Sequence, residues 1–351
     1  MSLVDSSDRE QAVTPGLQVT VAICTWNRCD LLRQTLEQMT RLLIPAGLEY
    51  EILVVDNNST DATEQVVTGF AMRLPVRRVF ESTPGKSFAC NRAMREARGD
   101  YILWTDDDVL VEETWLVAFM EGARQFPEAA AFGGTIVPWF TAPPDPEMCD
   151  VFPALEMGFC GLERNMPAGV LPDEEQHIFG ANMAFRRRAV EGMSFDTAFG
   201  PSPHMLGGGV EELLFIRQLR RKGGIVIWLP AMRVKHYVMP SRTTLKYLKR
   251  FYKTKGYEHI VEQPPGDADV RRLAGAPRYL WRLWLTAKLR YSLSIIGWQT
   301  RSRSRWLFRS GPPASESSSR RVRSLTWLRE CVFLRGMIAG YRANAAGLRT
   351  R

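Results

Sequence analysis

Short apolar runs alternate with helix-like repeats over the first 110 residues of the chain. Four runs rich in branched or aromatic residues predict β-strands, at 19–24, 50–55, 76–80 and from 100 into three aspartates. The intervening segments show apolar residues at helical spacing. Strands that alternate with helices predict a layered α/β fold built on a largely parallel sheet.

Local signals place the start of the second of these helices. Ser59 or Thr60 is expected to cap it, and Asp61 and Glu64 are favourable in its first turn.

The middle of the chain is less regular. Residues 138–175 are rich in Pro, Met and aromatic residues and predict a long connection or lid, after which order resumes at 177–190. The stretch 207–224 indicates a Gly-rich loop and an amphipathic helix that ends at a glycine pair. A further strand is predicted at 225–230, and Val-Lys-His follows at 234–236.

Charge divides the chain near residue 240. Residues 1–240 hold 22 Lys and Arg against 32 Asp and Glu, a net charge of −10. Residues 241–351 hold 24 against 6, a net charge of +18. We therefore expect a polar leader at 1–17, an acidic α/β domain at 18–240 and a basic helical region at 241–351.

The basic region combines its charge with apolar helices. Residues 279–298 and 324–341 are apolar and aromatic but interrupted by Arg and Lys, and the Arg/Ser-rich stretch 301–323 predicts a flexible link. Such helices favour contact with an anionic membrane surface. The alternative is a helical subdomain that packs on the core and exposes its arginines. Binding of nucleic acid is disfavoured, because only the charge of the region supports it.

Cysteine use and apolar runs indicate the compartment. The six cysteines form no CxxC pair, and the polar residues 1–17 show no secretory signal. The sequence contains no run of about 18 apolar residues, so it predicts no membrane-spanning helix. We expect a cytoplasmic protein that is peripheral at the inner face of the cell membrane.

Polar residues stand where three predicted strands end. Thr25-Trp26-Asn27, Asp56 and Asp106–Asp108 all follow apolar runs. Because ligands bind at the carboxyl ends of parallel strands, these groups are expected to converge on one edge of the sheet. Adjacent aspartates repel one another, so Asp106–Asp108 favour a bound Mg²⁺ or Mn²⁺. The alternative is an acidic loop or helix start, since two glutamates follow at 112 and 113.

Other candidates each have a structural alternative. Asp56 is a candidate for binding a nucleotide base or ribose, or it is a turn residue. Glu211 and Glu212 offer a general base, or they are favourable acids at a helix N-terminus. His236 offers a metal ligand, although a lone histidine is more often structural. Lys86 and Arg92 could contact phosphate or be solvated.

Taken together, six segments resemble family 2 of the inverting glycosyltransferases, which have the GT-A fold, over about residues 18–240. They are VAICTWNR (21–28), ILVVDNNSTDAT (52–63), GKSFACNRAMREARGDYILWTDDD (85–108), FGANMAFRR (179–187), GVEELLFIRQL (209–219) and VKH (234–236). The fold that the resemblance implies is a Rossmann-like, mostly parallel mixed sheet flanked by helices.

The resemblance also implies roles for single residues. Eight residues of this chain match family positions that hold the donor nucleotide. They are Thr25, Asn27, Arg28, Asp56, Lys86, Asn91, Asp106 and Asp107. Asp106 and Asp108 match the DxD motif, with Asp108 the direct metal ligand and His236 a late ligand of the same metal. Asn182 and its neighbour Ala181 match positions near the donor sugar or acceptor. Glu211 best matches the catalytic base.

The chain departs from the family pattern at two places. Val210-Glu211 stands where the family often has Glu-Asp, so a register slip of one would make Glu212 the base. Cys90 replaces an arginine that could contact phosphate, and Lys86 or Arg92 would then substitute for it.

The implied reaction is a single displacement with inversion at the anomeric carbon. A nucleotide-sugar, with a UDP-sugar as default, would give its sugar to a hydroxyl of a saccharide or lipid-linked acceptor, in polysaccharide or glycolipid synthesis. Mg²⁺ or Mn²⁺ would stabilise the departing diphosphate. Two other functions are compatible with the residues: a nucleotidyltransferase, or a non-catalytic membrane- or nucleic-acid-binding protein of transferase fold.

Overall fold

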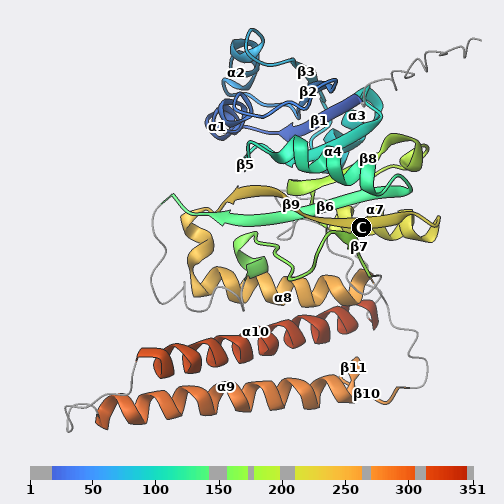
Figure 1. Ribbon diagram of the computed structural model, residues 1–351. Helices are drawn as coiled ribbons and strands as arrows, with labels where there is room; N and C mark the ends of the chain where they lie inside the picture. The colour runs from blue at the N-terminus through green and yellow to red at the C-terminus, as the bar shows by residue number, and fades with distance from the viewer. Residues whose placement is uncertain are drawn as a thin grey trace, which may run out of the picture.

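A computed structural model describes residues 18–141, 156–172, 178–197, 210–262, 270–304 and 314–345. One mixed sheet of nine strands runs through the described N-terminal part, in the order β3-β2-β1-β4-β8-β6-β9-β5, with β7 paired to β9 (Figure 1).

The first half of the sheet is parallel. It consists of β1 (Gln18–Thr25), β2 (Glu49–Asp56), β3 (Val76–Phe80) and β4 (Tyr101–Asp106). The register places Thr25 beside Asp56 and Cys24 beside Asp106. The three predicted strand ends therefore meet at one edge, as expected from the alternation of strands and helices.

The second half is mixed. β8 (Met183–Arg186) is antiparallel to both β4 and β6 (Ala129–Trp139), and β6 is parallel to β9 (Ile225–Tyr237). The short strand β5 (Val109–Val111) is antiparallel to β9 and pairs Val109 with His236. β7 (Gly169–Val170) is also antiparallel to β9. The β5–β9 pairing brings His236 next to the aspartates, although 128 positions separate Asp108 from His236.

Amphipathic helices cover the sheet. They are α1 (Cys29–Met39), α2 (Thr63–Phe70), α3 (Lys86–Glu96), α4 (Trp115–Gln125) and α7 (Val210–Arg221). Each buries an apolar stripe, such as Leu32 and Leu36 of α1, in the core that the strands share. Four short 3₁₀ turns complete this part: η1 (Glu156–Phe159), η2 (Gly180–Asn182), η3 (Arg187–Val190) and η4 (Pro240–Thr243).

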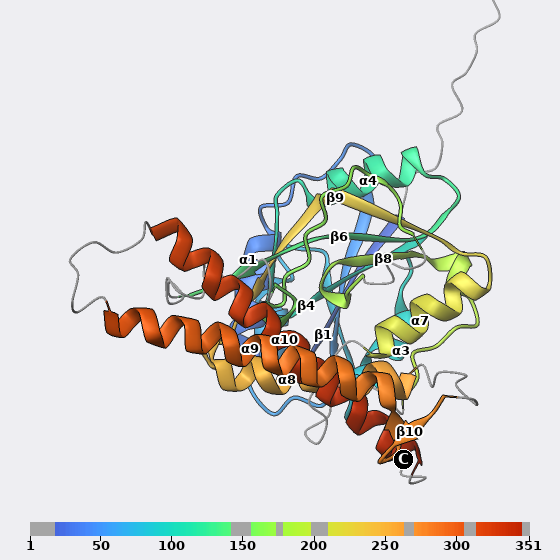
Figure 2. The ribbon, with the colours of Figure 1, turned by 90° about the horizontal axis from the view of Figure 1, so that it is seen from below.

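Three helices form a separate layer below the sheet (Figures 1 and 2). α8 (Leu245–Glu262) is nearest the sheet, and α10 (Ala314–Ala345) lies between α8 and α9 (Arg278–Ser304). A small hairpin, β10 (Arg272–Leu273) with β11 (Ala276–Pro277), precedes α9. α8 and α10 cross closely at Gly256 and Gly336, where an added Cβ would collide with the backbone of the other helix.

Several predictions about elements are wrong. The segments 225–230 and 234–236 belong to one long strand, because β9 pairs with β6 on both sides of an irregularity at 230–232. α2 begins at Thr63 with Ala62 as its cap residue; Asp61, rather than Ser59 or Thr60, accepts bonds from the amide and hydroxyl of Thr63. Residues 301–304 and 314–323 are helical, not a flexible link. β6 extends to Trp139 and so overlaps the start of the predicted lid.

Other predictions fall outside the described residues or are untested. The leader 1–17 and the stretch 142–155 of the predicted lid lie outside them. The domain boundaries at 17 and 240 stay predictions. None of the described helices combines the length and the apolarity that crossing a bilayer requires.

Candidate active site at the carboxyl edge of the sheet

The loops after β1 and β2 are tied to each other. Asn27 adopts a left-handed backbone conformation, and its Oδ1 accepts a hydrogen bond of 2.7 Å from the amide of Thr60. The amide of Asn27 in turn donates to Ser59 Oγ. Asp56 is buried and accepts bonds from the amide of Ser59 and the guanidinium of Arg78. Thr25, Asn27 and Asp56 therefore form one preorganised corner.

The three consecutive aspartates point in different directions. Asp107 faces the β1 side, where Thr25 Oγ1 donates to its Oδ2 at 2.7 Å and Arg28 Nη1 donates to its Oδ1 at 3.1 Å. Arg28 also donates to Asp108 Oδ2 at 2.9 Å. Burial, followed by the charge of Asp108, raises the pKa of Asp107 to about 7. Asp107 thus fixes Thr25 and Arg28 in place.

Asp106, Asp108 and His236 face one another instead, and we call these three residues the triad. One potential ligand atom from each lies within 4.8 Å of the other two. His236 Nε2 is 3.8 Å from Asp106 Oδ2 and 3.7 Å from Asp108 Oδ1. His236 Nδ1 lies 3.0 Å from the carbonyl oxygen of Tyr237 and donates its proton there, so Nε2 is the ring nitrogen that faces the aspartates.

Lys86 joins the triad to the acids of α7. Its Nζ donates to Glu212 Oε1 at 2.9 Å and lies 3.4 Å from Asp106 Oδ1. Burial favours the neutral amine, but the carboxylates of Asp106 and Glu212 outweigh burial and hold the pKa of Lys86 well above its ordinary value. Burial likewise opposes ionisation of Asp106, yet Lys86 and His236 keep its pKa below the ordinary value.

The two acids of α7 are placed differently. Glu212 Oε2 accepts a 2.8 Å bond from the amide of Gly180, so both of its oxygens are held by this bond and by Lys86. Glu211 is fully buried in the first turn of the same helix. The tied loops after β1 and β2, a possible cation site and two buried carboxylates therefore share one edge of the sheet.

Comparison with known proteins identifies this arrangement. Residues 20–193 match the model of the family described as "Glycosyl transferase family 2". The chain belongs to glycosyl transferase family 2.

Named relatives cover most of this glycosyltransferase. It is 24% identical over 248 residues to the succinoglycan biosynthesis protein ExoM of Rhizobium meliloti, a match that spans 69% of this chain and 74% of that protein. It is 24% identical over 237 residues to the glucosyl-dolichyl phosphate glucuronosyltransferase of Haloferax volcanii, spanning 66% and 73%. The crystal structure of S. aureus TarS 1–349 matches with a TM-score of 0.50 and 13% identity, over 95% of this chain and 93% of that one. The predicted GT-A fold is thereby confirmed.

Asn182 lies in the core of the glycosyltransferase, away from solvent. Its side chain is 0% exposed, and its amide donates to the carbonyls of Thr135 and Met232 while accepting from Trp115 Nε1. A Cβ at Gly134 would collide with this amide, which shows how closely the strands approach it. Asn182 and its buried neighbour Ala181 were predicted to lie near the sugar or acceptor, and the structure instead gives Asn182 a packing role.

The Asn182→Ala substitution is therefore expected to destabilise the fold rather than weaken substrate binding. It leaves three buried polar partners without the amide, at a cost of about 3 kcal/mol in the free energy of unfolding. Urea denaturation measures this loss, and the donor KM of the folded protein should stay unchanged. A raised KM at unchanged stability would restore the predicted substrate contact.

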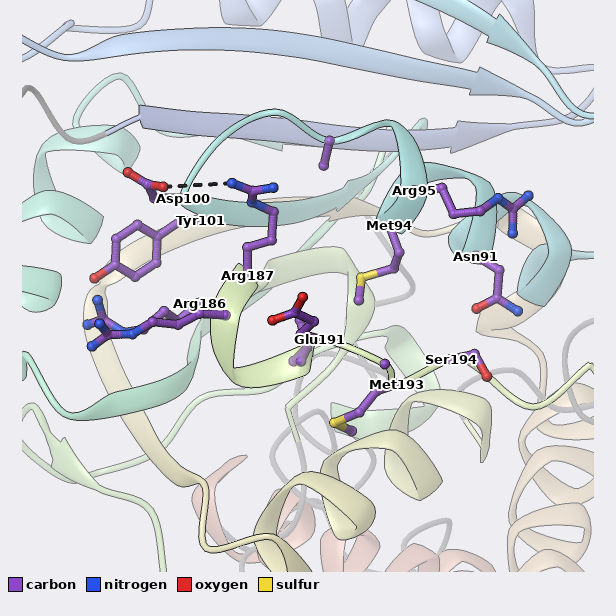
Figure 3. Close-up of a pocket in the computed structure, with 14 residues that line it drawn as sticks. Asn91, Met94, Arg95, Asp100, Tyr101, Arg186, Arg187, Glu191, Met193 and Ser194 are labelled. Carbon is purple, nitrogen blue, oxygen red and sulfur yellow. Dashed lines mark ion pairs between the residues drawn. The ribbon is translucent and has the colours of Figure 1, made fainter.

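The side chain of Asn91 is engaged outside the triad. Its side chain exchanges hydrogen bonds with the backbone of Phe195, and it lines a hollow of about 930 Å³ with Tyr101 and Arg186 (Figure 3). This hollow lies at the beginning of β4, whereas the triad lies at its end, about 17 Å along the strand at ~3.3 Å per residue. Its outer wall carries Arg187, which reaches toward Asp100. The Asn91 side chain is thus engaged by Phe195, and its role in binding the donor stays a prediction.

The position of Cys90 explains the departure from the family pattern. Cys90 is buried, and its Sγ lies 3.9 Å from Cys24 Sγ beneath the edge of the sheet. Of the two proposed substitutes for the missing arginine, Lys86 is in the site. Arg92 instead pairs with Glu96 on its own helix.

The sequence analysis placed Trp26 at a strand end without giving it a role, and it missed Arg242. Trp26 is 54% exposed between Thr25 and Asn27, and an exposed tryptophan at a strand end was a usable signal. Arg242 of η4 is held by Cys160 and lies over the Tyr247 ring, and the charge of Asp108 contributes to raising its pKa against the opposing effect of burial. Nothing in the local sequence around Arg242 indicated that the chain returns to the triad.

Proposed function

We propose that the protein is a metal-dependent, inverting glycosyltransferase that moves a sugar from a nucleotide-sugar to a hydroxyl acceptor. The observation that carries the proposal is the triad of Asp106, Asp108 and His236, joined through Lys86 to Glu212, whose neighbour Glu211 is also buried. Family membership supports glycosyl transfer from a nucleotide-sugar. Metal use and the residue roles are our inference from the site, and inversion is what the resemblance to inverting glycosyltransferases implies.

The triad fits a divalent cation. Asp108 Oδ1 is buried and accepts no hydrogen bond from any residue that the structure describes, so it is available as a ligand. Two carboxylates and one imidazole nitrogen would hold the ion, with remaining positions open to phosphate oxygens. A cation bound there supplies positive charge that stabilises the diphosphate as it leaves.

Removal of divalent ions is expected to abolish activity, and Mn²⁺ should restore it at a lower concentration than Mg²⁺. The reason is the imidazole nitrogen, which Mn²⁺ accepts more readily than Mg²⁺ does. His236→Ala should weaken Mn²⁺ binding by about 10- to 100-fold, by analogy with the loss of groups that tune a metal site. Titration of EDTA-treated protein by calorimetry measures both ions. Equal affinity for Mn²⁺ in wild type and variant would remove His236 from the site.

The acids of α7 have separate roles in this proposal. Glu211 accepts the proton of the acceptor hydroxyl, and that oxygen attacks the anomeric carbon from the face opposite the nucleotide. The bond from the anomeric carbon to the diphosphate breaks, and the diphosphate leaves with the electron pair. Glu212 is the positioning residue, because its carboxylate is already engaged by Lys86 and Gly180.

The corner at the ends of β1 and β2 is proposed to hold the nucleotide. Asp56 is oriented by Arg78 and Ser59, and its oxygens keep lone pairs for a base or ribose contact. Trp26 offers an exposed indole on which a base can stack. Arg28 and Lys86 supply positive charge near the phosphates.

The acceptor is proposed to be a saccharide or a lipid-linked sugar. One relative is named for succinoglycan biosynthesis and another for a glucosyl-dolichyl phosphate substrate, and both names support this class. A lipid-linked acceptor would bring the reaction to a bilayer, where the basic region 241–351 is proposed to meet anionic lipid.

A panel of nucleotide-sugars tests the donor assignment. Thermal stabilisation of the full-length protein is measured with each donor, with Mn²⁺ and with EDTA. We expect at least one donor, with a UDP-sugar tried first, to raise Tm only when Mn²⁺ is present. Stabilisation by none of the donors would reject the proposed function.

A further inference from the structure

α9 is attached to the protein by one face only. Leu280 and Ala287 are buried against α10, where they share an apolar cluster with Ile338 and Tyr341. Figure 1 shows α9 as the outermost helix of the layer, with α10 between it and α8.

The opposite face of α9 carries large apolar side chains. Leu285, Leu289 and Leu293 are 56%, 59% and 57% exposed. Their spacing of four residues aligns them in one stripe along the helix, and we call this stripe the outer face of α9. Tyr279 and Leu283, both also nearly half exposed, flank it. A helix that is apolar on two faces is normally covered on both.

The charge of α9 indicates what covers the outer face. Arg278–Ser304 contains six Lys and Arg and no Asp or Glu. Arg282 is exposed. It lies one helical turn before Leu285 and two turns before Leu289, and so adjoins the stripe. Lys288 and Arg290 lie over Trp284 and Trp327, so their charged ends are at the flanks of the helix. An apolar stripe bordered by cations fits the boundary between acyl chains and anionic headgroups.

Charge argues against the other simple occupant, a second copy of the same face. Two such faces would bring together cations from both helices with no acid on either, which is repulsive. An anionic bilayer provides the opposite charge and an apolar layer for the leucines at the same time.

We propose that the outer face of α9 is the membrane-contacting surface, and that it lies in the interface of an anionic lipid bilayer. This inference names the element and residues behind the membrane contact of the proposed function. The proposed function supplies only the reason why the enzyme would meet a bilayer. Vesicle binding itself is measured without donor or acceptor.

Co-sedimentation of the full-length protein with vesicles tests the proposal. The wild type should bind vesicles of phosphatidylcholine with about one-third phosphatidylglycerol and bind pure phosphatidylcholine at least tenfold more weakly. The triple substitution Leu285→Ser, Leu289→Ser, Leu293→Ser should reduce binding to the anionic vesicles by tenfold or more. The matched control Leu43→Ser, Ile44→Ser, Met72→Ser removes three exposed apolar chains from the α1–α2 side and should bind like wild type.

The outcomes separate the possible explanations. Wild type that does not bind anionic vesicles, or a triple variant that binds like wild type, overturns the proposal. Sedimentation velocity without lipid is run in parallel, and a wild-type dimer that the triple variant loses would assign the face to a second copy instead. Metal-dependent turnover of donor by the triple variant, with vesicle binding lost, shows a folded enzyme. If the wild type binds vesicles but turns over no donor, the proposed function is rejected and the membrane-contacting role of α9 stands.

Discussion

Replacing Asp108 by Asn is expected to lower kcat/KM about 1,000-fold, which corresponds to about 4 kcal/mol of transition-state stabilisation. Asp108 Oδ1 is buried and faces His236, while Oδ2 accepts from Arg28. An amide keeps the size of the side chain but removes the charge that binds a cation. The loss should therefore appear in Mn²⁺ binding as well as in turnover.

Donor turnover and Mn²⁺ affinity are measured on the same preparation of this variant. Asp100→Asn is the matched control, because Asp100 is an exposed aspartate at the other end of β4. It should retain wild-type values of both. An Asp108→Asn enzyme with full turnover would contradict the assignment of the DxD carboxylate.

Glu211→Gln is expected to lower kcat by about 1,000-fold with little change in the donor KM. General-base catalysis contributes ~10²–10⁴-fold, and glutamine cannot accept the proton of the acceptor hydroxyl. Single-turnover and steady-state kinetics with a soluble acceptor, or with water as acceptor, measure the two parameters separately.

Glu212→Gln separates the two neighbouring acids. It leaves one oxygen for Gly180 or Lys86 but removes the charge that Lys86 faces, so we expect a loss of about tenfold in kcat together with lower stability. If Glu212→Gln abolishes turnover while Glu211→Gln remains active, the base is Glu212 and the family register is displaced by one.

The edge of the sheet could be predicted from the sequence because its signals are local. Apolar runs that end in polar residues placed Thr25, Asp56 and Asp106 at strand ends, and parallel pairing makes such ends meet. The family resemblance assigned roles to His236 and to the acids of α7, which the residues alone had left as candidates. The structure places these residues together at that edge; their catalytic roles stay predictions.

Contacts between distant residues could not be predicted in the same way. Lys86 meets Glu212 across 126 positions, and His236 reaches the aspartates only because β9 continues past residue 230 to pair with β5. Residues 231–237 do alternate between buried and more exposed positions, which is a strand signal beyond Pro230. The sequence does not show, however, that this stretch pairs with β5 and β6.

Asn182 and Asn91 illustrate a different limit. Both are polar residues in motif segments, where a functional role was expected, yet each satisfies buried backbone groups. A sequence motif does not distinguish a polar side chain that binds a ligand from one that satisfies the interior, because both need hydrogen-bond partners.

The most direct test of the central claim is proton NMR of donor turnover by the full-length enzyme, followed from the first minutes. With an α-linked nucleotide-sugar and Mn²⁺, we predict release of a nucleoside diphosphate and first appearance of the sugar as the β anomer, with neither product when EDTA replaces Mn²⁺. Release of pyrophosphate, first appearance of the α anomer, or undiminished turnover in EDTA would contradict a metal-dependent, inverting glycosyltransferase.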